Sequence, residues 1–305
     1  MTQPGPPPLD RAAYPVYQHQ VSGQGWPDQA PTNPVVLDPA ATGQLEPVPP
    51  LANPAWPQPG NPPAQPMPHL ALRGTCKVYP GHPPVHALDN VTLEITPGEF
   101  VAVVGPSGSG KTTMLSIMGT LDTPSAGEVW IDGVDTTQLR QAQRSRLRSD
   151  RIGFVFQQFY LLPSLTALDN VATGMLYQGY PPAKRRQAAL AALDLVGLLP
   201  RASHRPGELS GGEQQRVAIA RAIAGGPAIL FADEPTGALD QASGQRLIQV
   251  LRTVNQTGAT VVVITHDEHL ATHFSRRISM VDGRVVGDAV QTPRREAPPQ
   301  PVVAL

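Results

Sequence analysis

Short apolar runs alternate with helical stretches along the middle of the chain. Three of the runs are almost wholly apolar, as is typical of strands buried on both faces of a parallel sheet: residues 100–105, 228–232 and 260–264. Between and around them, the spacing of apolar positions predicts helices over residues 167–178, 183–196, 211–224 and 241–254. Buried strands that alternate with helices predict an α/β fold with a mainly parallel sheet.

Other strands carry weaker patterns. Val91, Leu93 and Ile95 alternate with polar residues, which predicts a half-buried strand over 86–95. Residues 127–132 and 152–156 are expected to form short strands. Asp282 and Gly283 form a two-residue turn signal between two further strands, so a hairpin is expected over residues 277–286.

Proline is concentrated at the start of the chain. Of the 36 prolines in 305 residues, 19 precede Leu70, and only five residues in that segment are charged. Such a segment lacks the large apolar side chains that offset the entropy of ordering a chain. We therefore expect a disordered Pro-rich tail over residues 1–69, a folded domain over 70–290 and a flexible tail over 291–305.

Charge and cysteine content narrow the class of protein. The formal net charge of −1 argues against a chain that binds nucleic acid through bulk electrostatics. Cys76 is the single cysteine, which excludes an internal disulfide and fits a reducing compartment. No apolar run approaches the ~18 residues of a membrane span, and the first residues lack the pattern of a signal peptide. Five arginines between Arg140 and Arg151 are expected to form a solvated helix face.

A glycine-rich stretch follows the first apolar run and fits the pattern G-x-x-x-x-G-K-[ST] at every fixed position. Its backbone N–H groups and the following helix N-terminus are suited to hold phosphates, with a lysine on the β- and γ-phosphates and a threonine hydroxyl on Mg²⁺. The residues assigned to ATP binding here are Gly105, Pro106, Ser107, Gly108, Ser109, Gly110, Lys111, Thr112 and Thr113.

Two carboxylates end the second apolar run. Asp233 and Glu234 follow four apolar residues, a costly position for charge unless a cation or partner meets it. Phosphoryl transfer needs an acid on the metal and a group that orients the attacking water. Asp233 is therefore predicted to bind Mg²⁺, and Glu234 to act on the water.

Further residues resemble the motifs of the ATP-binding cassette (ABC) ATPases, in family order over about residues 70–288. Leu209, Ser210, Gly211, Gly212 and Glu213 open a run that resembles the signature motif. The remaining matches are Gln157 with the Q-loop glutamine, Ala238, Leu239 and Asp240 with the D-loop, His266 with the switch histidine, and Tyr79 with the aromatic residue that stacks on adenine.

The resemblance implies a P-loop NTPase core with an antiparallel β-subdomain and an inserted α-helical subdomain. It implies a head-to-tail homodimer in which each signature completes the ATP site of the other copy. Glu234, His266 and Gln157 would be catalytic, and Thr112, Gln157 and Asp233 would hold Mg²⁺.

The sequences of residues 119–129, 164–171 and 232–240 most resemble those of the branch that contains macrolide exporters, lipoprotein-release systems and FtsE-type complexes. That resemblance implies an ATPase that drives a separate FtsX-type permease, for export or extraction. The protein would then be cytoplasmic and peripheral on the inner face of the membrane. An FtsE-like ATPase that transmits mechanical change to a cell-envelope process, without transport, uses the same motifs and stays open.

Overall fold

The computed structural model describes residues 67–237 and 239–293. Most of the predicted N-terminal tail, residues 294–305 and the predicted D-loop residue Ala238 lie outside this part of the chain. Within it, no helix is both long enough and apolar enough to cross a membrane.

Two sheets organise the described residues. A six-stranded sheet has the order β10-β9-β3-β8-β7-β6, in which β10 is antiparallel to β9 and the other neighbours are parallel. Its strands are β3 (Phe100–Val104), β6 (Ile152–Val155), β7 (Ile229–Asp233), β8 (Thr260–Thr265), β9 (Arg276–Val281) and β10 (Arg284–Val290). An antiparallel sheet has the order β2-β1-β4-β5, made of β1 (Leu70–Tyr79), β2 (Val85–Ile95), β4 (Ala126–Ile131) and β5 (Val134–Asp135).

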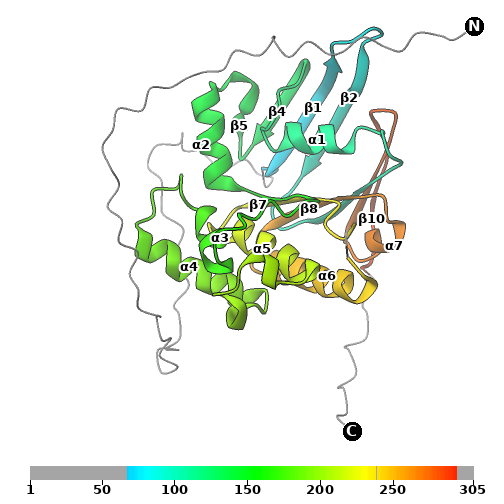
Figure 1. The fold of residues 1–305 in the computed structure, drawn as a ribbon. Coiled ribbons are helices and arrows are strands. Elements are labelled where there is room, and N and C mark those ends of the chain that lie inside the picture. The colour runs from blue at the N-terminus through cyan, green and yellow to red at the C-terminus, as the bar shows by residue number, and fades with distance from the viewer. Residues whose placement is uncertain (1–66, 238, 294–305) are drawn as a thin grey trace, which may run out of the picture. The chain divides into compact units, whose positions relative to one another are not determined.

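Seven helices complete this part of the fold. They are α1 (Lys111–Met118), α2 (Gln141–Arg151), α3 (Ala167–Thr173), α4 (Pro182–Leu195), α5 (Gly211–Ile223), α6 (Gln241–Gln256) and α7 (Glu268–Ala271). Short 3₁₀ turns cover Thr136–Gln138, Leu199–Arg201 and Pro206–Glu208. In Figure 1, α1 lies beside β1 and β2, whereas α3, α4, α5 and α6 lie on the other side of β7 and β8.

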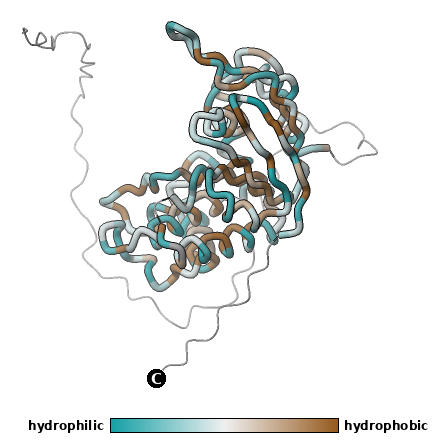
Figure 2. The backbone as a smooth tube through the Cα atoms, turned by 90° about the vertical axis from the view of Figure 1, so that its right-hand side faces the viewer, coloured by the Kyte–Doolittle hydropathy of each residue, from teal (hydrophilic) through white to brown (hydrophobic). Residues whose placement is uncertain are grey.

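The six-stranded sheet separates two hydrophobic clusters. Successive residues of a strand point to opposite faces, so β7 sends Leu230 into one cluster and Phe231 into the other. One cluster is formed with α3, α4, α5 and α6, and the other with α1 and the antiparallel sheet. Figure 2 shows the hydrophobic stretches gathered around these central strands. The central strands are apolar on both faces because helices pack on one face and α1 with the antiparallel sheet packs on the other. This arrangement confirms the predicted α/β fold.

The structure differs from the sequence predictions at one helix and adds one strand. The helix predicted over 167–178 ends at Thr173, and the following residues form tighter turns, with Met175 N–H donating to Ala172 O and Leu176 N–H to Thr173 O. Gly174 lies against the backbone of Arg221, where a β-carbon would not fit, so close contact with α5 ends the helix. Strand β1 was not predicted, because Gly74 (φ +56°) and several register shifts interrupt its alternation.

The arginine-rich stretch forms α2, but its arginines are not all solvated as predicted: Arg144 and Arg148 are partly buried. Leu147 is the one residue of α2 that is fully buried. Arg148 donates to the carbonyl of Thr120 at 2.9 Å, and Arg151 pairs with Asp132 at 3.5 Å. These two side chains therefore fasten α2 to the turns around the antiparallel sheet.

Candidate functional site

The glycine-rich loop connects the fully buried strand β3 to α1. Gly108 and Gly110 have φ values of +83° and +94°, a region that favours glycine. A β-carbon at Gly110 would also collide with the carbonyl of Ala87 in β2. The glycines at these two positions are thus required by the backbone path, which folds the loop back onto the first turn of α1.

Lys111 and Ser109 place polar groups inside this loop. The Lys111 ammonium is nearly buried and donates to the carbonyls of Gly105 at 2.8 Å and Pro106 at 2.9 Å. The Ser109 hydroxyl is buried and has no hydrogen-bond partner among the described residues. A cation held by neutral carbonyls and a free donor together suit an anion such as phosphate.

Asp233 ends β7 beside the start of α1. The Thr112 hydroxyl donates a hydrogen bond to its carboxylate. Burial raises the pKa of Asp233, and the charge of Glu234 raises it further, while the Thr112 hydrogen bond and Lys111 oppose the shift. A partly desolvated carboxylate next to a hydroxyl oxygen is a hard donor set that fits Mg²⁺. No cluster of three or more His, Cys, Asp or Glu side chains suited to a metal occurs among residues 67–237 and 239–293.

The raised pKa of Asp233 has a consequence for stability. Because the folded state holds the Asp233 proton more tightly than the unfolded state does, Asp233 adds to the free energy of unfolding at pH values below its unfolded pKa. This stabilisation is lost as the pH rises through the higher folded pKa, so the charged carboxylate is destabilising at neutral pH. We expect Asp233→Asn to raise the melting temperature at pH 7 without nucleotide, by about 2–4 °C per kcal/mol of relieved desolvation. It should also weaken the stabilisation that Mg²⁺ and ATP give the wild type. A scanning fluorimetry series with and without Mg-ATP measures both effects; a lower melting temperature without nucleotide would contradict the argument.

Glu234 lies where β7 and β8 end side by side. Its φ of +45° is rare for a non-glycine residue, and its N–H donates to Ile264 O at 2.9 Å. His266 Nδ1 donates to one carboxylate oxygen at 2.8 Å, and the Thr265 hydroxyl lies 3.3 Å from the other. The carboxyl side chain is 16% exposed, against 65% for His266. Sequence reasoning missed Thr265; its signal was a polar residue at the end of an apolar strand.

Gln157 follows β6 in an exposed loop. A β-carbon at Gly237 would lie 3.4 Å from its Nε2, so the amide sits beside the loop after β7. The neighbouring strand ends β6 and β7 therefore bring Gln157 to the loop that begins with Glu234.

Tyr79 ends β1 and is 36% exposed. Its hydroxyl donates to Asp122 at 3.0 Å, and the Lys77 ammonium lies 4.9 Å from the ring centroid. Lys77 also pairs with Asp122 at 2.7 Å. With a cation over one face, the ring has at most its other face for stacking on a base.

The predicted signature opens α5. Ser210 caps this helix: its hydroxyl accepts from Glu213 N–H, and its N–H donates to the Glu213 carboxylate at 2.9 Å. The backbone hydrogen bond from Ser210 is the main reason that the pKa of Glu213 is lowered. Helix α5 packs mainly on α3, α4, α6 and β6, whereas α1 packs on β1, β2, β7 and β8. The signature and the glycine-rich loop of one chain are thus built into different parts of the fold.

The described part of the predicted D-loop leads into α6, whose first turn contacts the start of the signature helix. Asp240 caps α6 by accepting from the N–H and the hydroxyl of Ser243, at 2.9 and 2.8 Å, and these hydrogen bonds lower its pKa. Ser243 packs against Gly212, where an added β-carbon would lie 3.0 Å from its hydroxyl oxygen. Leu239 packs partly buried against the hydrophobic cluster around α5 and α6.

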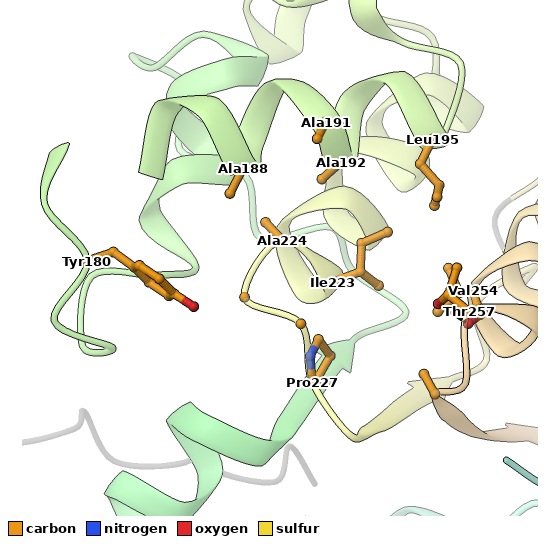
Figure 3. Close-up of a pocket in the computed structure, with 13 residues that line it drawn as sticks. Tyr180, Ala188, Ala191, Ala192, Leu195, Ile223, Ala224, Pro227, Val254 and Thr257 are labelled. Atoms are coloured by element: carbon orange, nitrogen blue, oxygen red, sulfur yellow. Dashed lines mark hydrogen bonds between the residues drawn. The ribbon is translucent and has the colours of Figure 1, made fainter. Parts of the chain in front are cut away.

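An apolar hollow of about 300 Å³ lies elsewhere, between α4, the end of α5 and the end of α6. Figure 3 shows Ala188 and Leu195 of α4 directed towards Ile223, with Val254 at one side. Its lining is mainly apolar and lacks the cations that phosphates need, so it is not a candidate nucleotide site.

Comparisons with known proteins agree with the motifs. Residues 88–237 match the family described as ABC transporter. The macrolide export ATP-binding/permease protein MacB of Burkholderia pseudomallei is 50% identical over 222 residues, which are 72% of this chain and 34% of MacB. The chain thus spans about a third of the length of these MacB relatives. The uncharacterized ABC transporter ATP-binding protein MJ0796 of Methanocaldococcus jannaschii is 48% identical, over 71% of this chain and 94% of its own.

Solved structures give the same assignment. The ATP-binding cassette MJ0796, in a dimeric post-hydrolysis state bound to ADP and Pi, has a TM-score of 0.67 and 46% identity, covering 72% of this chain and 98% of that one. A second dimeric structure of the same cassette matches equally well. The predicted family and the predicted P-loop fold are confirmed, and this chain belongs to the ABC transporter family as an ATP-binding cassette of its ATPases.

Proposed function

We propose that this chain is the ATP-binding subunit of an ABC transporter, that it hydrolyses ATP in a head-to-tail homodimer, and that it drives an FtsX-type permease for export or extraction. The observation that carries the dimer is the separation of the two predicted phosphate sites. The loop at Lys111 and the helix start at Ser210 belong to different packing layers, so a second copy is needed to bring a signature onto a bound nucleotide. The relative MJ0796 is described as dimeric.

Each side chain has a role in this proposal that the family resemblance implies and that its surroundings support. Residues 105–113 hold the phosphates, with Lys111 leaving its loop carbonyls for the β- and γ-phosphates. Thr112 and Asp233, with Gln157, hold Mg²⁺, which supplies charge neutralisation on the phosphate oxygens. Tyr79 stacks on adenine with the face opposite Lys77.

Glu234 accepts the proton of the attacking water, and His266 fixes one of its oxygens. Residues 209–213 and the D-loop residues Ala238, Leu239 and Asp240 of the opposite copy close the site. Protein in this role is cytoplasmic and peripheral, held at the inner face of the membrane through its permease, with no part for nucleic acid.

Light scattering tests the dimer. We expect the purified full chain to be monomeric or weakly dimeric without nucleotide and to gain mass with ATP, because association is linked to ATP binding. A stable dimer without ATP, or no phosphate release from ATP, contradicts the proposal.

Affinity purification from membranes tests the partner. We expect co-purification of a permease that resembles FtsX. If reconstituted vesicles hydrolyse ATP and move no solute while a cell-wall hydrolase responds, the FtsE-like alternative replaces transport.

A further inference from the structure

Thr265 lies between the two halves of the proposed catalytic site. It is the last residue of β8 and is fully buried. In the parallel ladder it pairs with Val104, the residue before the glycine-rich loop. On the other side of β8, Ile264 pairs with Asp233. Thr265 therefore stands at the point where the phosphate loop and the two carboxylates meet.

The hydroxyl of Thr265 has one proton to donate, and its surroundings leave one direction for it. Its oxygen accepts the Asp267 N–H at 3.0 Å, so its own proton is free to point elsewhere. The carboxylate oxygen Oε2 of Glu234 lies 3.3 Å away. A buried hydroxyl needs an acceptor, and an ionised carboxylate is a strong one.

The Glu234 carboxylate is thereby held at both oxygens. Oε1 accepts from His266, an exposed side chain, and Oε2 accepts from Thr265, a buried one. His266 lies exposed in the loop after β8, whereas Thr265 is buried at the end of the strand itself. Asp267, whose N–H is bound to Thr265, also caps α7 by accepting from His269 and Leu270 N–H at 2.8 and 3.1 Å.

We propose that Thr265 is a positioning residue for the Glu234 carboxylate, which it keeps aimed at the attacking water when His266 moves away to the γ-phosphate. This inference rests on the proposed role of Glu234 as general base. In this proposal the hydroxyl acts through Glu234, the side chain to which it donates. Loss of this hydrogen bond should therefore lower the rate of hydrolysis and leave ATP binding unchanged.

Thr265→Val tests the proposal, since valine keeps the shape and removes the hydroxyl. In the full chain we expect the rate at saturating ATP to fall by about 10- to 100-fold, the upper end being the cost of a misplacement of about 1 Å. The dissociation constant for ATP and the ATP-dependent gain in mass should stay within about twofold. Thr265→Ser, which restores the hydroxyl, should recover most of the rate. On a Glu234→Gln background, Thr265→Val should cost nothing further, because the two residues act as a unit.

Thr136→Val is the matched control. Thr136 is also buried and donates its hydroxyl to a backbone carbonyl, that of Val129, away from the site. It should lose stability to a similar extent and keep its rate. A structural role for Thr265 is shown instead if Thr265→Val weakens ATP binding as much as the rate, or if Thr265→Ser does not recover. If Glu234→Gln itself hydrolyses ATP normally, the proposed function fails; if only Thr265→Val does, the inference alone fails.

Discussion

Replacing Glu234 by glutamine should stop hydrolysis while ATP still binds. Glutamine keeps the shape of the side chain but cannot accept a proton, so hydrolysis should fall by roughly 10²–10⁴, the usual contribution of general base catalysis. Lys111, Thr112 and Asp233 are untouched, so the loop and the metal donors remain. The variant should therefore be a dimer with ATP and a monomer with ADP. Light scattering measures its molar mass in each nucleotide, and a phosphate-release assay measures hydrolysis.

Two further variants show whether the dimer forms through the shared site. Ser210→Arg in the Glu234→Gln chain should abolish the ATP-dependent dimer, because a bulky side chain then occupies the helix start that closes on the γ-phosphate. Ser164→Arg, the same change at an exposed serine outside the signature, should leave it intact. Glu94→Gln, at an exposed position of β2, controls for the loss of one carboxylate. If the Glu234→Gln variant stays monomeric in saturating ATP, the shared-site mechanism is contradicted.

Replacing Lys111 by alanine should nearly abolish ATP binding and turnover. Its ammonium is the one cationic side chain within residues 105–113, and a nearly buried cation meets phosphate with little competition from water. Removing one partner of a buried charge pair costs about 2–5 kcal/mol, so the dissociation constant for ATP should rise by roughly 30-fold or more. Titration calorimetry with Mg-ATP measures the loss.

Lys184→Ala provides the comparison, because Lys184 is exposed on α4 and bears the same side chain. It should bind and hydrolyse ATP like the wild type. Lys111→Ala chains that turn over ATP near the wild-type rate would show that phosphate is held elsewhere.

Three strands of the parallel sheet were predictable because their apolar runs have the length of a strand and are too short for a buried helix. Strands β3, β7 and β8 are buried on both faces, so nearly every position is apolar and the pattern survives without context. Strand β1 was not predictable, since its bulges disrupt the period on which the argument depends. The end of α3 was set by the approach of α5 at Gly174, a contact between segments distant in the sequence.

The candidate site divides in the same way. Residues of the glycine-rich loop and the carboxylates Asp233 and Glu234 are contiguous in sequence and carry their chemistry in their spacing. The partners that orient them come from other strands: Thr265 and His266 approach Glu234 from β8 and the loop that follows it. Lys77 and Tyr79 lie two residues apart on β1, and their contact was missed because that strand was not predicted. The contacts to Glu234 depend on sheet order and register, which a single sequence does not specify.

The alternation of side chains in the central sheet makes the cassette a single thermodynamic unit. Each of β3, β7 and β8 feeds both hydrophobic clusters, so melting one cluster exposes one face of the very strands that support the other. Neither half is therefore expected to melt independently, and unfolding is expected to be cooperative. Nucleotide that binds at the end of β3 then also stabilises the helices on the opposite face of the sheet, because they unfold together with that strand. The melting temperature of the whole cassette is therefore expected to rise when nucleotide binds at that one loop.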